Sequence, residues 1–304
     1  MIKNQVKSTL RKPAVIIKLV IVTLLFLPSL IGQLSLIIPF AREIDSEAQV
    51  TVPVVLIHMF DYFTFYVDVL FIGFILLIPD IVRNEYTEKQ CICRSNSRNK
   101  AGLIAIARIM VLSVIYVAWF AILTVILSGM VLHNFSSEWP DFIKLMLKSI
   151  PIDSGYVQTF IMVPKSALDY PVWVVVFLML LRSTIGFIFL GMLACFVTLV
   201  TNKLSHGVSV IIFLVAMSYF WVLDFSNAVV AYFNPSSVLD ETRKYIDMIK
   251  LTIVPLFTFR SVTDDFVYWM IYGISVGIIL SLLMGTGIML YFKKGDFGNA
   301  DRIE

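Results

Sequence analysis

The sequence predicts an all-α protein that crosses a membrane several times. Hydrophobic residues make up 59% of its 304 residues, and its mean hydropathy is +0.89. Long apolar runs recur along the chain, and a helix needs roughly 20 such residues to cross about 30 Å of hydrocarbon. Because lipid offers a backbone no hydrogen-bond partners, such runs are stable as helices, whose backbone groups bond to one another. A soluble globular fold is therefore excluded, and a single transmembrane domain over residues 1–304 is expected.

Six apolar runs have the length and composition of membrane spans. We place them at about 14–40, 58–82, 102–132, 172–200, 207–230 and 266–292. Prolines inside these runs are compatible with helices, since neighbouring helices can satisfy the backbone groups that a proline leaves free. The first run is too long for the apolar part of a secretory signal and no A-x-A-like site ends it, so we expect it to remain as a span.

The Lys and Arg residues indicate which side of the membrane each loop occupies. If the N-terminus is cytoplasmic, the inner segments hold most of the basic residues, chiefly in 1–18, 83–108 and 293–302. The outer segments are longer, yet they hold fewer basic residues and most of the acidic ones. The positive-inside rule therefore predicts a multi-pass protein of the cytoplasmic membrane with both termini in the cytoplasm. The net charge of +3 is a difference between two oppositely charged faces and does not indicate nucleic-acid binding.

Residues 1–12 are predicted to form a short helix at the inner membrane surface. An apolar stripe and a basic stripe run along it: Ile2, Val6 and Leu10, beside Lys3, Lys7 and Arg11. Such a helix would place its basic side chains among anionic lipid headgroups. The alternative is a frayed basic leader that only sets the topology.

The polar segment between the second and third runs is predicted to hold a cytoplasmic partner. Residues 83–100 are too many for a tight turn, and they are rich in helix formers after Asn84, which would cap a short helix of its own. Cys91 and Cys93 lack the spacing of a metal site, and a reducing compartment does not favour a disulfide. The chain also lacks H-E-x-x-H, G-x-S-x-G and P-loop motifs, so we expect no metal, catalytic or nucleotide site in it.

Two outer segments are predicted to form amphipathic helices. The first covers 139–148, with Ser137 as a cap and Pro140 in the first turn, and the second lies within 235–255. They are expected either to form a lid over a substrate exit or simply to cover the helix bundle.

Charged residues inside a membrane are expensive, so each one needs a partner or a function. Asp68 and Arg182 each lie about 10 residues, or about 15 Å, from the outer end of their runs, so their depths match. We predict that they form an ion pair, which would either lock two helices together or serve a transport path. Arg108 lies nearer the cytoplasmic end and is expected to snorkel to the interface.

This layout resembles the membrane subunit of type-2 ABC exporters, which has six spans, an interfacial N-terminal helix and a cytoplasmic coupling helix between spans two and three. Glu85 after the second span, and the Ser97-Arg98 pair before the third, are similar to the acidic residue and the small-residue-Arg turn that flank that helix. The ending 291–297 is similar to the aromatic-basic-Asp ending of such permeases. Residues 89–90 are Lys-Gln, where a Gly-Thr pair often follows the acid in the family.

The resemblance implies a permease with no ATPase site of its own. A separate cytoplasmic ABC ATPase, in two copies, would bind ATP and Mg and push the helix at 84–98. The contacts carried over are Glu85, Tyr86, Cys91, Ile92, Ser97 and Arg98. A second permease subunit, identical or paralogous, would complete the path. The expected cargo is amphipathic, such as an antimicrobial peptide, a drug or a lipid-like molecule, since no cluster of buried polar residues indicates a sugar or ion site.

Two other classes of function remain open. The chain could be a membrane anchor or sensor that uses 84–98 to dock a cytoplasmic partner without transport. It could also be an intramembrane enzyme, with His58, Asp61 and Asp68 as candidate acids and bases on one helical stripe. The enzyme is disfavoured because no paired catalytic motif is visible.

The predicted topology can be checked by cysteine labelling in a variant without native cysteines. A membrane-impermeant maleimide added from outside should label a cysteine placed near 145 or 245 and miss one near 90 or 300, because the basic segments stay inside. The reverse pattern would contradict the topology.

Overall fold

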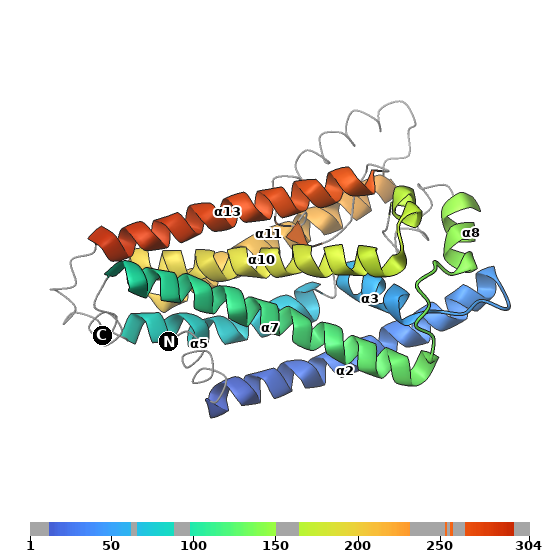
Figure 1. Ribbon diagram of the computed structural model, residues 1–304, viewed down its shortest axis with the longest axis horizontal. Coiled ribbons are helices and arrows are strands. Elements are labelled where there is room, and N and C mark those ends of the chain that lie inside the picture. The colour runs from blue at the N-terminus through green and yellow to red at the C-terminus, as the bar shows by residue number, and fades with distance from the viewer. Residues whose placement is uncertain are drawn as a thin grey trace.

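The computed structural model describes residues 12–61, 66–87, 98–149, 164–231, 253, 256–257 and 265–294. All regular elements within these ranges are helices, and the long ones run side by side in one elongated bundle (Figure 1). They are α2 (Pro13–Ile44), α3 (Val52–Asp61), the π-helix η1 (Tyr66–Phe71), α5 (Ile72–Thr87), α7 (Arg98–Leu132), α8 (Asp141–Ser149), the 3₁₀ helix η2 (Lys165–Asp169), α10 (Val172–Thr201), α11 (Leu204–Ala231) and α13 (Phe266–Lys294). The predicted all-α class is confirmed for these ranges.

Four helices in the described part of the chain are long and apolar enough to cross a membrane: α2, α7, α10 and α13. Their outward faces carry large exposed apolar side chains, such as Leu24 on α2, Met130 on α7 and Leu282 on α13. Water would disfavour so much exposed apolar surface, whereas lipid tails accommodate it. The chain therefore has the character of a membrane protein.

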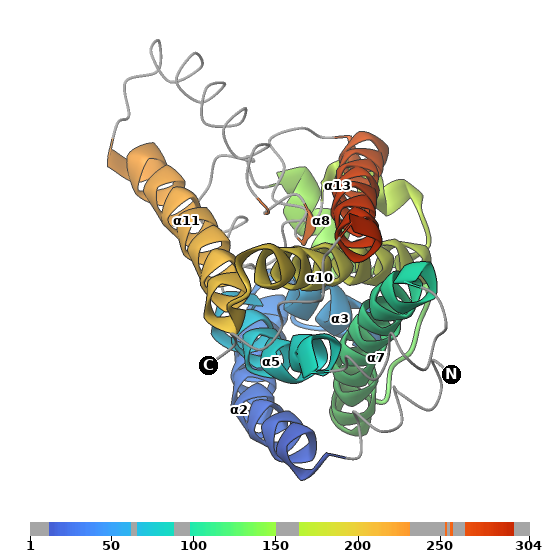
Figure 2. The same cartoon turned by 90° about the vertical axis from the view of Figure 1, so that its left-hand side faces the viewer.

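Helix α10 lies at the centre of the bundle, with α7, α11 and α13 around it (Figure 2). It runs parallel to α13 and packs closely against it. A Cβ on Gly277 would lie 2.6 Å from Ile185, and one on Gly287 would lie 2.7 Å from Phe196. These two close contacts are ten residues apart on α13. Glycines at both positions let α10 and α13 approach each other along much of their length.

The second apolar run differs from its prediction as a single helix at 58–82. Its first helix, α3, begins at Val52, and every residue from Thr51 to Phe60 is buried. The helix starts early because residues 52–57 are apolar, and because Pro53 falls in the first turn, where a proline is tolerated. The second part is η1 followed by α5, further along the bundle (Figure 1). The other five predicted runs match α2, α7, α10, α11 and α13. The ends of each run lie within four residues of the ends of its helix.

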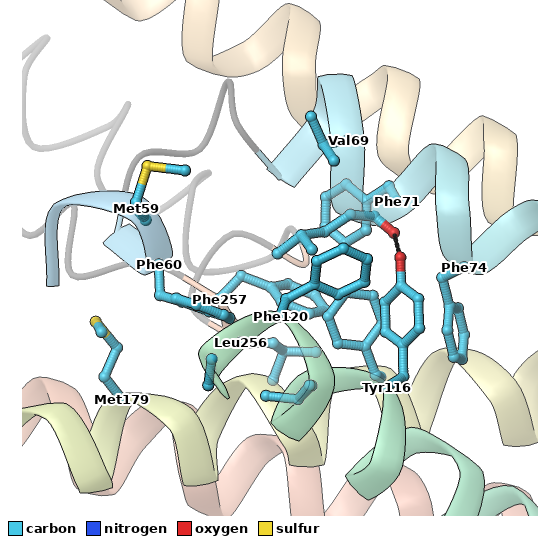
Figure 3. Packing of buried hydrophobic residues seen from close by; sticks show 14 of the residues in the cluster. Met59, Phe60, Val69, Phe71, Phe74, Tyr116, Phe120, Met179, Leu256 and Phe257 are labelled. Carbon is cyan, nitrogen blue, oxygen red and sulfur yellow. Dashed lines mark hydrogen bonds between the residues drawn. The ribbon is translucent and has the colours of Figure 1, made fainter. Parts of the chain in front are cut away.

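A cluster of aromatic rings packs around the π-helical turn (Figure 3). The ring of Tyr116 on α7 lies 5.5 Å from that of Phe74 on α5 and 5.3 Å from that of Phe187 on α10, centroid to centroid. The Tyr116 hydroxyl donates a buried hydrogen bond of 2.7 Å to the carbonyl oxygen of Leu70 in η1. A π-helical turn is rare and displaces the carbonyls from their α-helical positions, so a side-chain donor at this point stabilises it. The cluster thus joins α5, α7 and α10 at one level.

The loops at the end of the bundle where α10 begins form a hydrogen-bonded cap. Trp139 donates from Nε1 to the Tyr170 carbonyl oxygen at 2.8 Å, and the Val52 amide donates to the Asn134 carbonyl oxygen at 2.9 Å. The predicted helix at 139–148 is confirmed as α8, which packs against α2. The cap assigned to Ser137 is wrong, since α8 begins only at Asp141 and its first backbone bonds go to the Pro140 carbonyl oxygen. The predicted helix within 235–255 falls almost wholly outside the described residues.

The two ends of the bundle differ in charge, although exposed Arg42 and Lys165 also lie at the more acidic end. Lys100, Lys203 and Lys293 are exposed at the end where α7 begins. Glu138, Asp141, Asp169 and Asp265 are exposed at the opposite end. The loops that the charge pattern groups together therefore do lie together in space.

The packing at the π-helical turn predicts a stability difference between two glycine variants. A Cβ on Gly73 would lie 2.5 Å from the Tyr116 hydroxyl oxygen and would also meet Val22 of α2. Gly73→Ala should therefore lower the free energy of unfolding by more than Tyr116→Phe, which loses one hydrogen bond worth about 1 kcal/mol. The measurement is reversible unfolding in lipid bicelles. Gly32→Ala is the control, since a Cβ there meets no atom within 4 Å. Equal effects of the two alanines would contradict this packing.

Candidate functional site

The predicted coupling segment connects two long helices. Helix α5 continues through Thr87 and α7 begins at Arg98, while Cys91, Ile92 and Ser97 lie outside the described residues. Glu85 and Tyr86 belong to the last turn of α5, and the structure describes only their backbone, as it does for Arg98.

The prediction that Asn84 caps a separate helix is wrong, because Asn84 lies inside α5. Residues 80–87 contain no glycine or proline, and side chains such as Arg and Glu favour continuation of a helix. The segment 88–97 is therefore attached directly to helices at both of its ends. A displacement of this segment would act on α5 and α7 without an intervening loop.

Aromatic contacts link those two helices to the centre of the bundle. Phe74 of α5 lies 4.8 Å from Phe187 of α10, ring centroid to ring centroid, and both rings contact Tyr116 of α7. All three side chains are buried. Because packed cores transmit displacements with little compression, a movement of α5 would reach α10 through these rings.

An ion pair joins α2 to α5 near the basic end of the bundle. Lys18 Nζ lies 2.5 Å from Asp80 Oδ2, and the two side chains are 28% and 18% exposed. Partial burial reduces screening by salt, so the pair is stronger than one on an open surface. Sequence alone does not predict this ion pair, because Lys18 and Asp80 each lie near the end of a predicted span, where a charged residue needs no partner. The available signal is that both charges fall inside apolar runs.

A second polar contact joins α2 to α3 nearer the other end. His58 Nε2 lies 2.7 Å from Gln33 Oε1, and His58 is 4% exposed. The two side chains are thus joined by a hydrogen bond between helices. The single stripe predicted for His58, Asp61 and Asp68 cannot be followed here, since the side chains of both aspartates lie outside the described residues. Gln33 was not singled out, although an amide inside an apolar run is itself a signal for a partner.

Arg182 is enclosed in the bundle, as its predicted depth requires. It is 1% exposed, and its Nη1 donates to the sulfur of Met270 on α13 at 3.8 Å. Asp68 belongs to η1, and the structure describes only its backbone. Phe71, three residues after Asp68, lies 5.8 Å from Phe187, five residues after Arg182, between ring centroids. The two charged positions are therefore at similar heights, and their pairing stays a prediction.

The expectation that Arg108 snorkels to the interface is wrong. Arg108 is 1% exposed, so the bundle encloses it. It lies ten residues after the start of α7, about 15 Å along the helix, on the buried stripe that also holds Ala105 and Leu112. Arg108 is buried because it lies on the face of α7 that packs into the bundle, and its distance from the end of the helix matters less.

Within the described ranges, no three His, Cys, Asp or Glu side chains lie together as a metal site would need. No protein-family model, curated protein or solved structure matches the chain. The candidate site is therefore defined by geometry: a polar segment attached to α5 and α7, an ion pair that ties α5 to α2, and aromatic contacts that tie α5 and α7 to α10.

The proposed pairing of Asp68 with Arg182 predicts a non-additive pair of substitutions. Asp68→Asn and Arg182→Gln should each destabilise the protein by roughly 3–5 kcal/mol, because each leaves a buried charge without its partner. The double variant should recover part of that loss in a thermal unfolding assay in detergent. Asp61→Asn and Asp224→Asn are the matched controls, expected to show no coupling to Arg182→Gln. Strict additivity for Asp68 would rule the pair out.

Proposed function

We propose that the chain is the membrane subunit of an ATP-driven exporter of the type-2 ABC kind. The observation that supports this best is the junction of α5 and α7. A short polar segment joins these two helices at the basic end of the bundle, and buried aromatic rings pack both against the central helix α10. That arrangement suits an element that receives a push from a cytoplasmic partner and passes it into the membrane domain.

In this proposal six spans cross the cytoplasmic membrane, with both termini inside. The spans are α2, the α3–η1–α5 run, α7, α10, α11 and α13. The end with Lys100, Lys203 and Lys293 faces the cytoplasm, as the positive-inside rule favours. The end with α8 and the hydrogen-bonded cap faces outward. Residues 1–11 lie outside the described residues, and the proposal keeps the helix predicted over 1–12 at the inner surface among lipid headgroups.

The chemistry of ATP takes place outside this chain. Two ABC ATPase subunits bind ATP and Mg, and their closure displaces residues 84–98 of two permease subunits. Helices α5 and α7 move with that segment and shift the bundle between inward-open and outward-open states. The cargo is an amphipathic molecule, such as an antimicrobial peptide, a drug or a lipid, because the described core is dominated by apolar and aromatic side chains.

The coupling segment can be tested by substitution. Replacing Ile92 by Ser and Arg98 by Ala together should release the ATPase during purification in mild detergent, because an apolar contact and a charged contact are both lost. Vanadate-sensitive ATP turnover should fall to the level of the isolated ATPase, while membrane insertion stays unchanged.

A matched control lies at the same end of the bundle. Lys203→Ala changes an exposed basic residue between α10 and α11, outside the proposed contact, and should leave copurification intact. Full retention of the ATPase by the Ile92/Arg98 variant would contradict the proposed role of the segment. A partner that binds there without ATP turnover would favour the anchor or sensor function.

A further inference from the structure

Helix α2 presents one continuous face to the bundle. Its buried residues recur at helical spacing along the whole helix: Val15, Val22, Phe26, Leu30, Leu34, Ile37 and Ala41. Lys18 and Gln33 fall on the same face, three residues after Val15 and Leu30. A polar side chain on this side of a membrane helix is stable only with a protein partner. Both residues have one.

The two partners belong to different parts of the second apolar run. Lys18 pairs with Asp80 of α5, and Gln33 bonds to His58 of α3. Between these contacts, Val22 of α2 packs against Gly73 of α5, which has no side chain to obstruct it. Helix α2 is therefore connected to the inner part of the run near one end and to its outer part near the other.

Between the same two contacts, the second run uses more residues than α2 does. From Val22 to Gln33 is 11 residues, whereas from His58 to Gly73 is 15 residues. As straight α-helices these stretches would span about 16 Å and about 22 Å. Part of the excess is taken up where η1 has π-helical geometry, which adds residues without adding length. The contacts of α2 therefore give α5 and α3 a connection besides the run itself.

We propose that α2 is a strut that carries the movement of α5 to α3, with Lys18 and Gln33 as positioning residues. This inference rests on the proposed function of the segment 84–98. Helix α2 has 32 residues and continues through Pro28, so it spans the distance between both contacts. Apolar surfaces slide over one another, whereas an ion pair and a hydrogen bond fix the register. The amide of Val52 at the start of α3 bonds to Asn134 of the outer cap, so the movement ends at the outer side.

The experiment compares movement at the two ends of the bundle. The complex of the full chain with its ATPase is reconstituted in liposomes, with spin labels on unnatural residues so that the native cysteines stay. An inner pair, at Leu76 and Leu290, reports on α5 relative to α13. An outer pair, at Gln49 and Val267, reports on the start of α3 relative to α13. All four side chains are exposed, so a label at any of them points away from the packed core. Distances are measured before and after trapping with ATP and vanadate.

In the native chain both pairs should change on trapping. In Asp80→Asn and in Gln33→Leu, the inner pair should still change while the outer pair loses most of its change. Exchange of the two charges, Lys18→Asp with Asp80→Lys, should restore the outer change, and this variant keeps the test valid if Asp80→Asn folds poorly. Ser35→Ala is the control, because its hydroxyl is exposed and bonds within α2.

Two results would overturn the strut. One is an outer change that persists in both Asp80→Asn and Gln33→Leu. The other is a charge-exchanged chain that folds and keeps its inner change but does not regain the outer one. Absence of any change at either pair in the native chain would instead contradict the proposed function, and the role of α2 would fall with it.

Discussion

The absence of water in the hydrocarbon region is the constraint on which this structure depends. Backbone groups there must bond to one another, so the apolar runs are helices. Polar side chains must find partners inside the protein, so Lys18, Gln33 and Tyr116 all turn toward the bundle and bond across helices. Each bond joins a helix to a neighbour at a fixed height. The few polar residues in an apolar chain thereby set the register of α2, α5 and α7.

The same contacts connect local structure to the proposed function. Gly73 lets α2 and the Tyr116 hydroxyl approach α5, and the aromatic rings around Tyr116 continue to α10. Under the proposed function, a segment attached to the ends of α5 and α7 would therefore act on the half of the bundle nearest to it. The outer half has its own connections, through the capping loops and the Gln33–His58 bond. Helices α7 and α10 pack against both halves, and α2 joins them through polar side-chain contacts.

Apolar length predicts the long helices well, because crossing a membrane imposes a minimum number of residues; α10 and α13 differ from their predicted bounds by at most two residues. The start of α3 and the continuation of α5 through Asn84 are missed, since local signals for caps are weak beside helix propensity and packing. Depth alone suggests where Arg108 should go, but its face of α7 places it inside. The Lys18–Asp80 and Gln33–His58 contacts depend on the relative register of separate helices, which one sequence does not specify.

Hydrogen exchange over residues 84–98 tests the central claim most directly. The full chain is reconstituted in lipid with and without the proposed ABC ATPase, and backbone exchange is followed by mass spectrometry. If this segment is the coupling element, its amides should exchange more slowly when the ATPase is present, and trapping with ATP and vanadate should change that protection again. The turn between α10 and α11 provides an internal reference at the same end of the bundle. Exchange over 84–98 that is the same with and without the ATPase would contradict the account.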